Sequence, residues 1–496
     1  MFSDNSNNDS KMDKSGRGLL HYHYTSSRDF SVLVGFFILI VMVNILTVGS
    51  VINVVVTVPQ YIYVLYLLSK KQLKNAILAH FSFFLLSFSL QSTLGMLDEK
   101  TTLLYNYGTI KLLGPLRASY AMNILLIMYC RSNKLKLNKT ILYYKLFKTI
   151  SIICFIACAI GLCGLAFHPY YSWEGFISIA VYMFAVISTM NILLCVADKA
   201  FVESVYYLTI SIFFSTIIGS YLCYLLGVVS RYSAYDIIFT PDVVYLAPAL
   251  LIGILSITQK KWLIISLVMY IPICMGVGGK SVFGLVFVGV CLAYIVLFDK
   301  EFDLNHKNNI KKIRILFFFI FIIITFVALP RISEETMVFY KFKTAESMFS
   351  GDLSEVSSSP YIRIASLINI FYEGINNLFV LILGNGYGGY FEDHFGLFDA
   401  VNLEEGAWQG EDLHTGRYHS GHDTMVTVPL YNGFLGLFLL LRICIQYIKR
   451  IPQNFLSSIS FLWIVLVFYY DTVLAVGGAF TLLGAEFEIT YLKNKK

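Results

Sequence analysis

Four of the chain's nine histidines lie within 29 residues of one polar stretch: His394, His414, His419 and His422. His422 lies just before a long apolar segment, so its imidazole is predicted to sit at a water–membrane boundary. A neutral imidazole there is suited to accept a proton from a hydroxyl group near pH 7. We therefore predict that His422 is a catalytic base. Its neighbours His419, Asp423 and Glu411 are the candidates to orient it or to hold substrate hydroxyls.

A zinc site is the alternative use of these histidines. His414, His419 and His422 are spaced by five and three residues, with Asp423 adjacent. This spacing does not form the HExxH pattern of zinc enzymes, and several histidines commonly share a polar loop without binding a metal. We therefore expect no metal ion and no other cofactor.

A glycine-rich turn, Gly384-Asn385-Gly386-Tyr387-Gly388-Gly389, opens the loop that carries these histidines. It lacks the Lys-Ser/Thr pair of a phosphate-binding P-loop and follows no βαβ pattern. Glycine readily adopts the left-handed conformation that ends helices. The turn is therefore predicted to end the helix that precedes it.

Three cations stand next to apolar segments: Lys280 after Gly278-Gly279, Arg363 at the start of segment 361–383, and Arg231. Fixed positive charge at a membrane surface can bind a diphosphate, and we predict this role for them. The alternative is that each side chain reaches to lipid headgroups. For Arg231 this alternative is at least as good an interpretation.

The composition excludes a soluble protein. The 496 residues are 57% hydrophobic and 14% charged, with a mean hydropathy of +0.70, whereas soluble domains carry roughly 25% charged residues. Runs of the length that a bilayer span requires recur along the chain. The net charge of +6 comes from short basic clusters between these runs, so it predicts membrane topology and not nucleic-acid binding.

The basic clusters predict an all-α polytopic protein of about fourteen spans with both termini in the cytoplasm. Clusters after the second, fourth, eighth, tenth, twelfth and last spans all fall on the inner side in this arrangement. The predicted spans are 31–48, 52–69, 75–95, 112–130, 142–167, 175–196, 205–228, 242–258, 262–278, 281–298, 313–329, 424–448, 455–473 and 475–492.

Segment 361–383 is apolar enough to be a further span, but we interpret it as an amphipathic helix on the outer face. Were it to cross the bilayer, Lys449-Arg450 would lie outside, against the positive-inside rule. The loop 384–423 also holds eight acidic residues against Arg417 alone, unlike the other inner loops. The chain then divides into an N-terminal bundle of about eleven spans (1–329), an external region (330–423) and three C-terminal spans (424–496).

With these residues in view, the chain resembles the superfamily of O-antigen polymerases (Wzy) and O-antigen ligases. The family carries a histidine, usually followed by asparagine, before a helix with a Gly-x-x-Gly pair, as His422-Asp423 and Gly433…Gly436 do here. It also places an arginine about twenty residues before a glycine turn, which Arg363 matches. A third motif ends in arginine, and here Gly278-Gly279-Lys280-Ser281 has lysine instead. Asp423 and Lys280 are thus departures from the family pattern.

The resemblance implies a metal-independent glycosyltransferase of the membrane-embedded, GT-C-like class in the bacterial inner membrane. A polymerase would move a growing glycan from undecaprenyl diphosphate to a non-reducing-end hydroxyl of the next lipid-linked repeat. His422 would be the base on the periplasmic face, and Lys280 and Arg363 would stabilise the leaving diphosphate. Aromatic side chains would stack on sugar rings or pack the loop: Tyr387, Tyr390, Trp408 and Tyr418.

Two other functions stay open at the sequence level. An O-antigen ligase or protein oligosaccharyltransferase would differ only in its acceptor. A flippase for lipid-linked oligosaccharides usually has internal repeats and charges at the bilayer midplane, and neither is evident here. In each case the expected partners are the lipid-linked oligosaccharide and the lipid bilayer, with a chain-length regulator and flippase of the same pathway, and no nucleic acid.

Overall fold

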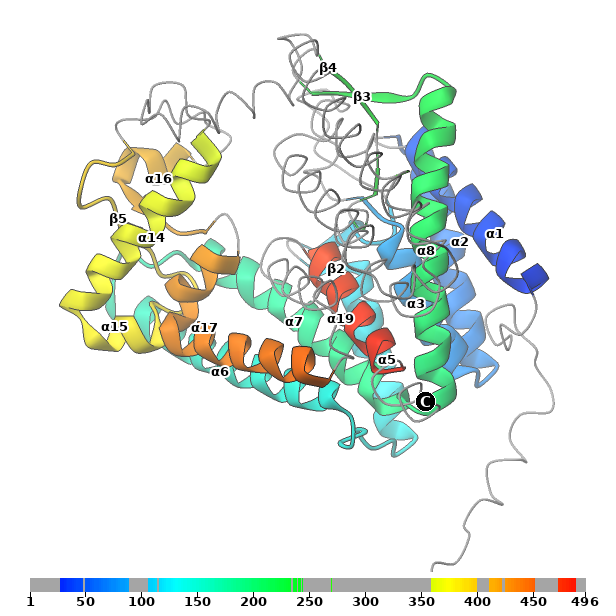
Figure 1. The fold of residues 1–496 in the computed structure, drawn as a ribbon, viewed down its shortest axis with the longest axis horizontal. Coiled ribbons are helices and arrows are strands. Elements are labelled where there is room, and N and C mark those ends of the chain that lie inside the picture. Colours follow the sequence, from blue (N-terminus) through cyan, green and yellow to red (C-terminus); the bar gives the residue numbers. More distant parts are fainter. Residues whose placement is uncertain are drawn as a thin grey trace, which may run out of the picture.

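The computed structural model describes residues 27–47, 50–88, 106–113, 116–232, 235–238, 240–241, 243, 269, 358–398, 410–421, 424–450 and 472–487. The described part is mostly helical (Figure 1). Five predicted spans lie outside it except for one or two positions each at most: 242–258, 262–278, 281–298, 313–329 and 455–473.

Five described helices are long and apolar enough to cross a membrane, as expected of a multi-pass membrane protein. They are α2 (Ile52–Ser69), α6 (Leu142–Phe167), α7 (Trp173–Val196), α8 (Lys199–Leu225) and α17 (Thr424–Arg450). The bounds of α2 and α6 coincide with the predicted spans. Four further helices of the described part are α1 (Ser27–Leu46), α3 (Leu73–Leu85), α5 (Ala118–Ser132) and α19 (Thr472–Phe487).

The core of the bundle forms where α8 packs between α1 and α19 (Figure 1). Small residues allow the close approach: a Cβ at Gly219 of α8 would lie 2.8 Å from Val41 Cγ1 of α1. The buried hydroxyls of Ser215 and Thr216 donate back to carbonyls of α8 itself. The helix can therefore carry these polar residues away from water without leaving a donor unmatched.

A buried polar chain links α3, α5 and α7. His80 contacts the Tyr107 hydroxyl through Nδ1 (2.7 Å) and Asn123 Oδ1 through Nε2 (2.8 Å). The Asn123 amide in turn donates to Ser188 Oγ (2.8 Å). Because Asn123 Oδ1 only accepts, Nε2 of His80 carries a proton. Each member has a partner, which is the arrangement that a buried polar group requires.

Three short antiparallel strand pairs in the described part correct the all-α prediction to a mostly helical one. They are β1 (Lys111–Leu113) with β2 (Leu116–Arg117), β3 (Val229–Tyr232) with β4 (Tyr235–Ile238), and β5 (Phe391–Glu392) with β6 (Arg417–Tyr418). In the third pair Phe391 lies opposite Tyr418 and Glu392 opposite Arg417. Period-two patterns this short are not visible in a sequence, which is why these strands were not predicted.

Segment 361–383 is two helices and not the single helix predicted. α14 (Ser358–Asn376) ends at Asn377, whose side chain caps α15 (Leu378–Leu383) by accepting from the Phe379 amide (3.1 Å). α15 folds back close to α14, since a Cβ at Gly374 would lie 2.7 Å from Leu381 Cδ1. α14 carries apolar side chains on its outer face as well as its inner one, and the exposed ones are Ile364, Ile368, Phe371, Tyr372 and Ile375.

α17 lies alongside α6 and is broken at Gly433, whose φ of 61° and ψ of −173° are not helical. The Asn432 amide of α17 donates to the Ile153 carbonyl of α6 (3.1 Å), which joins the middles of the two helices. Figure 1 shows them side by side, with α14 and α15 gathered at one end of the pair. The break therefore lies in the part of α17 that faces α15 and the glycine turn.

Candidate functional site

The glycine turn 384–389 compensates for the break in α17. The Asn385 amide donates to the Leu430 carbonyl (2.7 Å), and the Gly386 amide donates to the Tyr431 carbonyl (3.2 Å). In an unbroken helix these carbonyls would bond amides four residues further on. The turn also ends α15 at Gly384, with φ of 78°, which confirms the predicted role.

The same turn is seated on the second half of α6 and on the 168–172 connection to α7. The Tyr387 amide donates to the Ala157 carbonyl of α6 (3.0 Å), and the Ser172 amide donates to the Gly388 carbonyl (2.9 Å). The Tyr171 hydroxyl donates to the Asn385 carbonyl (2.8 Å). Segments far apart in sequence are thus fixed together at one end of α6, α7 and α17.

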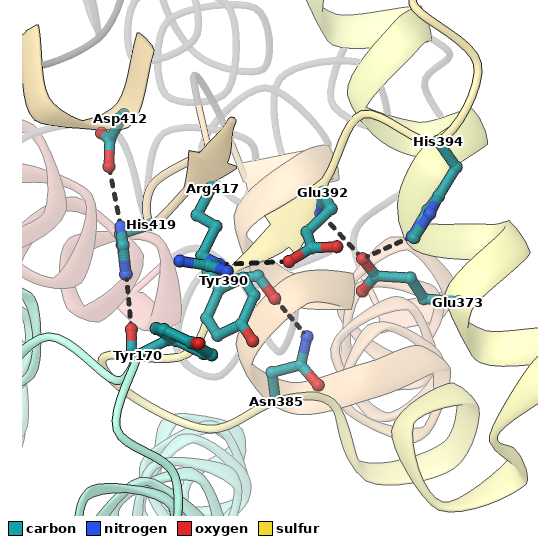
Figure 2. A network of polar contacts seen from close by, with 9 residues as sticks. All are labelled: Tyr170, Glu373, Asn385, Tyr390, Glu392, His394, Asp412, Arg417 and His419. Atoms are coloured by element: carbon teal, nitrogen blue, oxygen red, sulfur yellow. Dashed lines mark hydrogen bonds and ion pairs between the residues drawn. The ribbon is translucent and has the colours of Figure 1, made fainter. Parts of the chain in front are cut away.

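Arg417 is held beside this connection by an acidic and an aromatic partner (Figure 2). Its Nε contacts Glu392 Oε1 at 3.1 Å across the β5–β6 pair. Its guanidinium lies 3.6 Å from the centroid of the Tyr170 ring and 5.8 Å from that of Tyr390. Stacking on one ring and pairing with one carboxylate fix the guanidinium in orientation as well as position.

His419 has an acceptor at each ring nitrogen. Nδ1 lies 2.7 Å from Asp412 Oδ1, and Nε2 lies 3.0 Å from the Tyr170 carbonyl oxygen. A backbone carbonyl and a carboxylate both accept, so both contacts are satisfied when the ring carries two protons. The imidazolium is then paired with the buried Asp412. In this arrangement His419 ties the loop to the α6–α7 connection and has no nitrogen left to accept a proton.

A cavity of about 590 Å³ opens beside this cluster. Its apolar wall comes from α6 and α15 and includes Ile160, Phe167, Phe379 and Val380. Its polar wall comes from α14, the glycine turn and β5 and includes Glu373, Asn385, Glu392 and His394. The rings of His168, Tyr171 and Tyr390 lie among its lining residues. A concave site with mostly apolar walls and a few converging polar groups is the usual form of a small-molecule site.

Glu373 is the most constrained carboxylate in the cavity. Its Oε1 accepts from the Glu392 amide (2.8 Å) and contacts His394 Nε2 (3.1 Å), as Figure 2 shows. Burial raises the pKa of the Glu373 carboxyl above its usual value, while the Glu392 amide and His394 oppose that rise. A carboxylate of raised pKa beside an imidazole is a typical arrangement for accepting or sharing a proton.

The structure brings together only part of the set predicted from sequence. Tyr390 lines the cavity and its ring centroid lies 5.6 Å from that of His419. Arg363 lies nearly three turns before Glu373 on α14, about 15 Å along the axis, and is not among the described lining residues. Arg231 lies on β3, with its backbone opposite Asp236.

Two predicted aromatics have packing roles. Tyr387 is 1% exposed, with its ring edge-on to Tyr431. Tyr418 is buried and stacks on Phe391. In this conformation both rings pack inside the protein, which is the alternative to sugar stacking that the sequence left open. Glu411 lies in α16 (Gly410–Thr415). The remaining predicted residues lie outside the described part: Lys280, Trp408, His422 and Asp423.

Four charged residues of the site had no predicted chemical role: Glu373, Glu392, Asp412 and Arg417. A signal for two of them was present in the sequence. Glu373 is a single acidic residue inside the apolar run 361–383, and Arg417 is the single cation of an acidic loop. Isolated charges of this kind are typical of functional or paired groups. Their partners became visible only once α14 and the loop were placed in space.

The chain matches no family model, no curated protein and no solved structure. The function of this chain is therefore inferred from the sequence resemblance carried by the His422, Arg363 and Lys280 motifs, together with the geometry of the described residues.

Proposed function

We propose that the protein is a membrane-embedded glycosyltransferase that polymerises oligosaccharide repeats carried on a polyprenyl diphosphate. The observation that carries the proposal is the cavity at the ends of α6 and α15. It combines a carboxylate–imidazole pair, Glu373 and His394, with aromatic and apolar walls. Sugar chains need hydrogen-bonding groups beside aromatic faces, and a lipid-linked substrate needs these at the mouth of membrane helices.

The arrangement of the helices supports a periplasmic site. The loop from Gly384 to Gly421 is bonded to the α6–α7 connection, so both lie on one face. α17 begins at this face and carries Lys449 and Arg450 in its last turn. Because basic residues mark the cytoplasmic end of a span, the cavity belongs on the opposite, outer side. Fourteen spans with both termini inside fit this sidedness.

The reaction is a displacement at the anomeric carbon of the donor glycan. The acceptor hydroxyl oxygen forms the new bond to this carbon as the bond to the lipid diphosphate breaks. The diphosphate leaves with the electron pair, and the hydroxyl proton passes to a base, for which His422 is the candidate. Lys280 and Arg363, with Arg231 as a weaker candidate, would stabilise the charge on the diphosphate.

One experiment with protein reconstituted in liposomes distinguishes glycan transfer by a polymerase from transport of the lipid-linked repeat by a flippase. Purified protein in liposomes receives the lipid-linked repeat extracted from cells that lack the protein. A polymerase is expected to form a ladder of longer lipid-linked glycans and to release one undecaprenyl diphosphate per bond formed. Movement of the repeat between leaflets with no ladder and no released carrier would identify a flippase instead. Transfer only to an added lipid A core or peptide would identify a ligase.

A further inference from the structure

The cavity is poorly suited to a diphosphate. Among the described residues that line it there is no lysine or arginine, whereas Glu373 and Glu392 contribute two carboxylates. The nearest cation of the cluster, Arg417, is paired with Glu392. Binding a diphosphate requires fixed positive charge, and carboxylates in the same cavity would repel it.

A neutral, hydroxyl-rich ring fits the same walls well. Carboxylate oxygens accept hydrogen bonds from hydroxyl groups, and such charge-assisted bonds are stronger than neutral ones. Tyr171, Tyr390 and His168 offer rings against which the apolar face of a sugar can pack. The volume of about 590 Å³ lies within the range of sites for small organic ligands.

We propose that this cavity is the acceptor subsite, which binds the terminal, non-reducing sugar of the incoming repeat through a hydroxyl bonded to Glu373. The inference rests on the proposed polymerase function and assigns the acceptor, one of its two substrates, to this cavity. The non-reducing end is the part of the acceptor farthest from its own diphosphate, so an acidic cavity can receive it. The donor diphosphate then binds outside the cavity.

The surroundings of Glu373 hold its carboxylate in a fixed direction, so that it can bind that hydroxyl directly. It projects from a regular helix, α14, and its Oε1 is fixed by the Glu392 amide and His394 Nε2. A carboxylate fixed in this way needs little reorganisation when a hydroxyl arrives. His394 and Glu392 thus act through Glu373, by setting the direction of its carboxylate.

Cys163 provides a readout that does not depend on turnover. It is exposed and lines the cavity, whereas Cys158 on the same helix is half-buried and is not among the described lining residues. The rate of N-ethylmaleimide modification can be followed at both cysteines by mass spectrometry of otherwise unaltered protein.

Two probes are compared: the repeat oligosaccharide freed from its carrier by mild acid, and undecaprenyl diphosphate without sugar. The free oligosaccharide is expected to slow modification of Cys163 and to leave Cys158 unchanged. Slowing by undecaprenyl diphosphate and not by the oligosaccharide would overturn the assignment.

Glu373→Gln tests the named contact, with Glu174→Gln as the matched control. Glu174 is an exposed carboxylate in the first turn of α7 and is not among the described residues that line the cavity. The substitution replaces a charged hydrogen-bond acceptor by a neutral one. The concentration of oligosaccharide needed to protect Cys163 should therefore rise about 10-fold. It should also raise KM for the acceptor more than it lowers kcat, and the control should change neither. Equal protection in wild type and Glu373→Gln would remove Glu373 from the subsite.

The two proposals fail differently. Protection of Cys163 that weakens in Glu373→Gln, without any polymer from wild type, would retain a sugar subsite and refute the polymerase. A wild-type polymer ladder whose acceptor KM is unaffected by Glu373→Gln would retain the polymerase and refute the subsite.

Discussion

Gly384 and Gly433 meet backbone to backbone, where the end of α15 touches the break in α17. A Cβ on Gly384 would lie 2.5 Å from the Gly433 nitrogen, and one on Gly433 would lie 2.3 Å from the Ile382 carbonyl oxygen. Both residues have positive φ with extended ψ, a region that is essentially restricted to glycine. This contact sets the position of the glycine turn, and with it one wall of the cavity.

Gly433→Ala should therefore destabilise the protein by about 2 kcal/mol or more, from backbone strain together with the overlap at Ile382. Thermal unfolding of purified protein in detergent measures the change. Gly35→Ala is the matched control, because a Cβ there meets nothing within 4 Å and alanine favours its helix. Equal melting temperatures for the two variants would show that the glycine contact is unimportant.

Sequence predicts the described fold well where one physical rule dominates. Long apolar runs predicted the bounds of α2 and α6 to the residue, because a helix that crosses a bilayer requires a run of this length and hydropathy. The breaks at Asn377 and Gly433 were not predicted, since each depends on a contact from another segment. Asparagine and glycine permit such breaks, but only the hydrogen bonds from Asn385 and Gly386 make the second one stable.

The topology can be tested with two serine-to-cysteine changes at exposed positions. Ser420 lies in the loop after β6, and Ser132 ends α5 next to Arg131. Cysteine at 420 should react with an impermeant thiol reagent added outside the inner membrane, and cysteine at 132 only after the membrane is opened. Protection of position 420 would mean that α14 and α15 cross the bilayer, and the predicted side of the site would be wrong.

The raised pKa of Glu373 makes stability depend on pH in a defined direction. A carboxyl whose pKa is raised on folding stabilises the fold below its usual value of 4.5 and loses this contribution as pH rises through the folded pKa. Wild type should thus lose stability relative to Glu373→Gln as pH increases from 4.5. Melting temperatures of both proteins across pH 4 to 8 measure the difference. A difference that is constant with pH would mean that the pKa of Glu373 is the same folded and unfolded.

The candidate site was only partly predictable, for a physical reason. Tyr390 and His419 were found because aromatic and titratable residues in a polar loop are visible without structure. Glu373 lies in segment 361–383, for which the sequence predicts only an amphipathic helix. Its proximity to His394 depends on how α14 packs on the loop, and nothing in the local sequence encodes that contact.

The diphosphate-binding prediction concerns Lys280 and Arg363. Alanine at either position should strongly reduce polymer without lowering the amount of protein in the membrane, because the leaving charge loses its partner. Lys280→Arg should retain substantial activity, since it keeps the charge. Arg363→Lys should retain less if the contact is bidentate, because an ammonium cannot reproduce the guanidinium fork. Normal polymer from both alanine variants would leave these residues as interfacial side chains only.

The last prediction concerns His422, which the sequence marks as the base. The described part of the loop argues against His419 in this role, because both of its ring nitrogens contact acceptors. His422→Gln should lower the polymerisation rate on the order of 10²–10⁴-fold, the typical loss when a general base is removed. His414→Ala is the control, since His414 is an exposed residue in the last turn of α16.

Purified protein and a lipid-linked repeat, assayed with and without EDTA, separate a base from a metal ligand. A base at His422 predicts full wild-type activity in EDTA and a large loss in His422→Gln. If EDTA stops the wild type and zinc restores it, the histidines of the loop hold a metal and the metal-independent mechanism is wrong. If His422→Gln polymerises at the wild-type rate, the proton passes to another group, and Glu373 becomes the residue to examine because its carboxylate lies in the cavity.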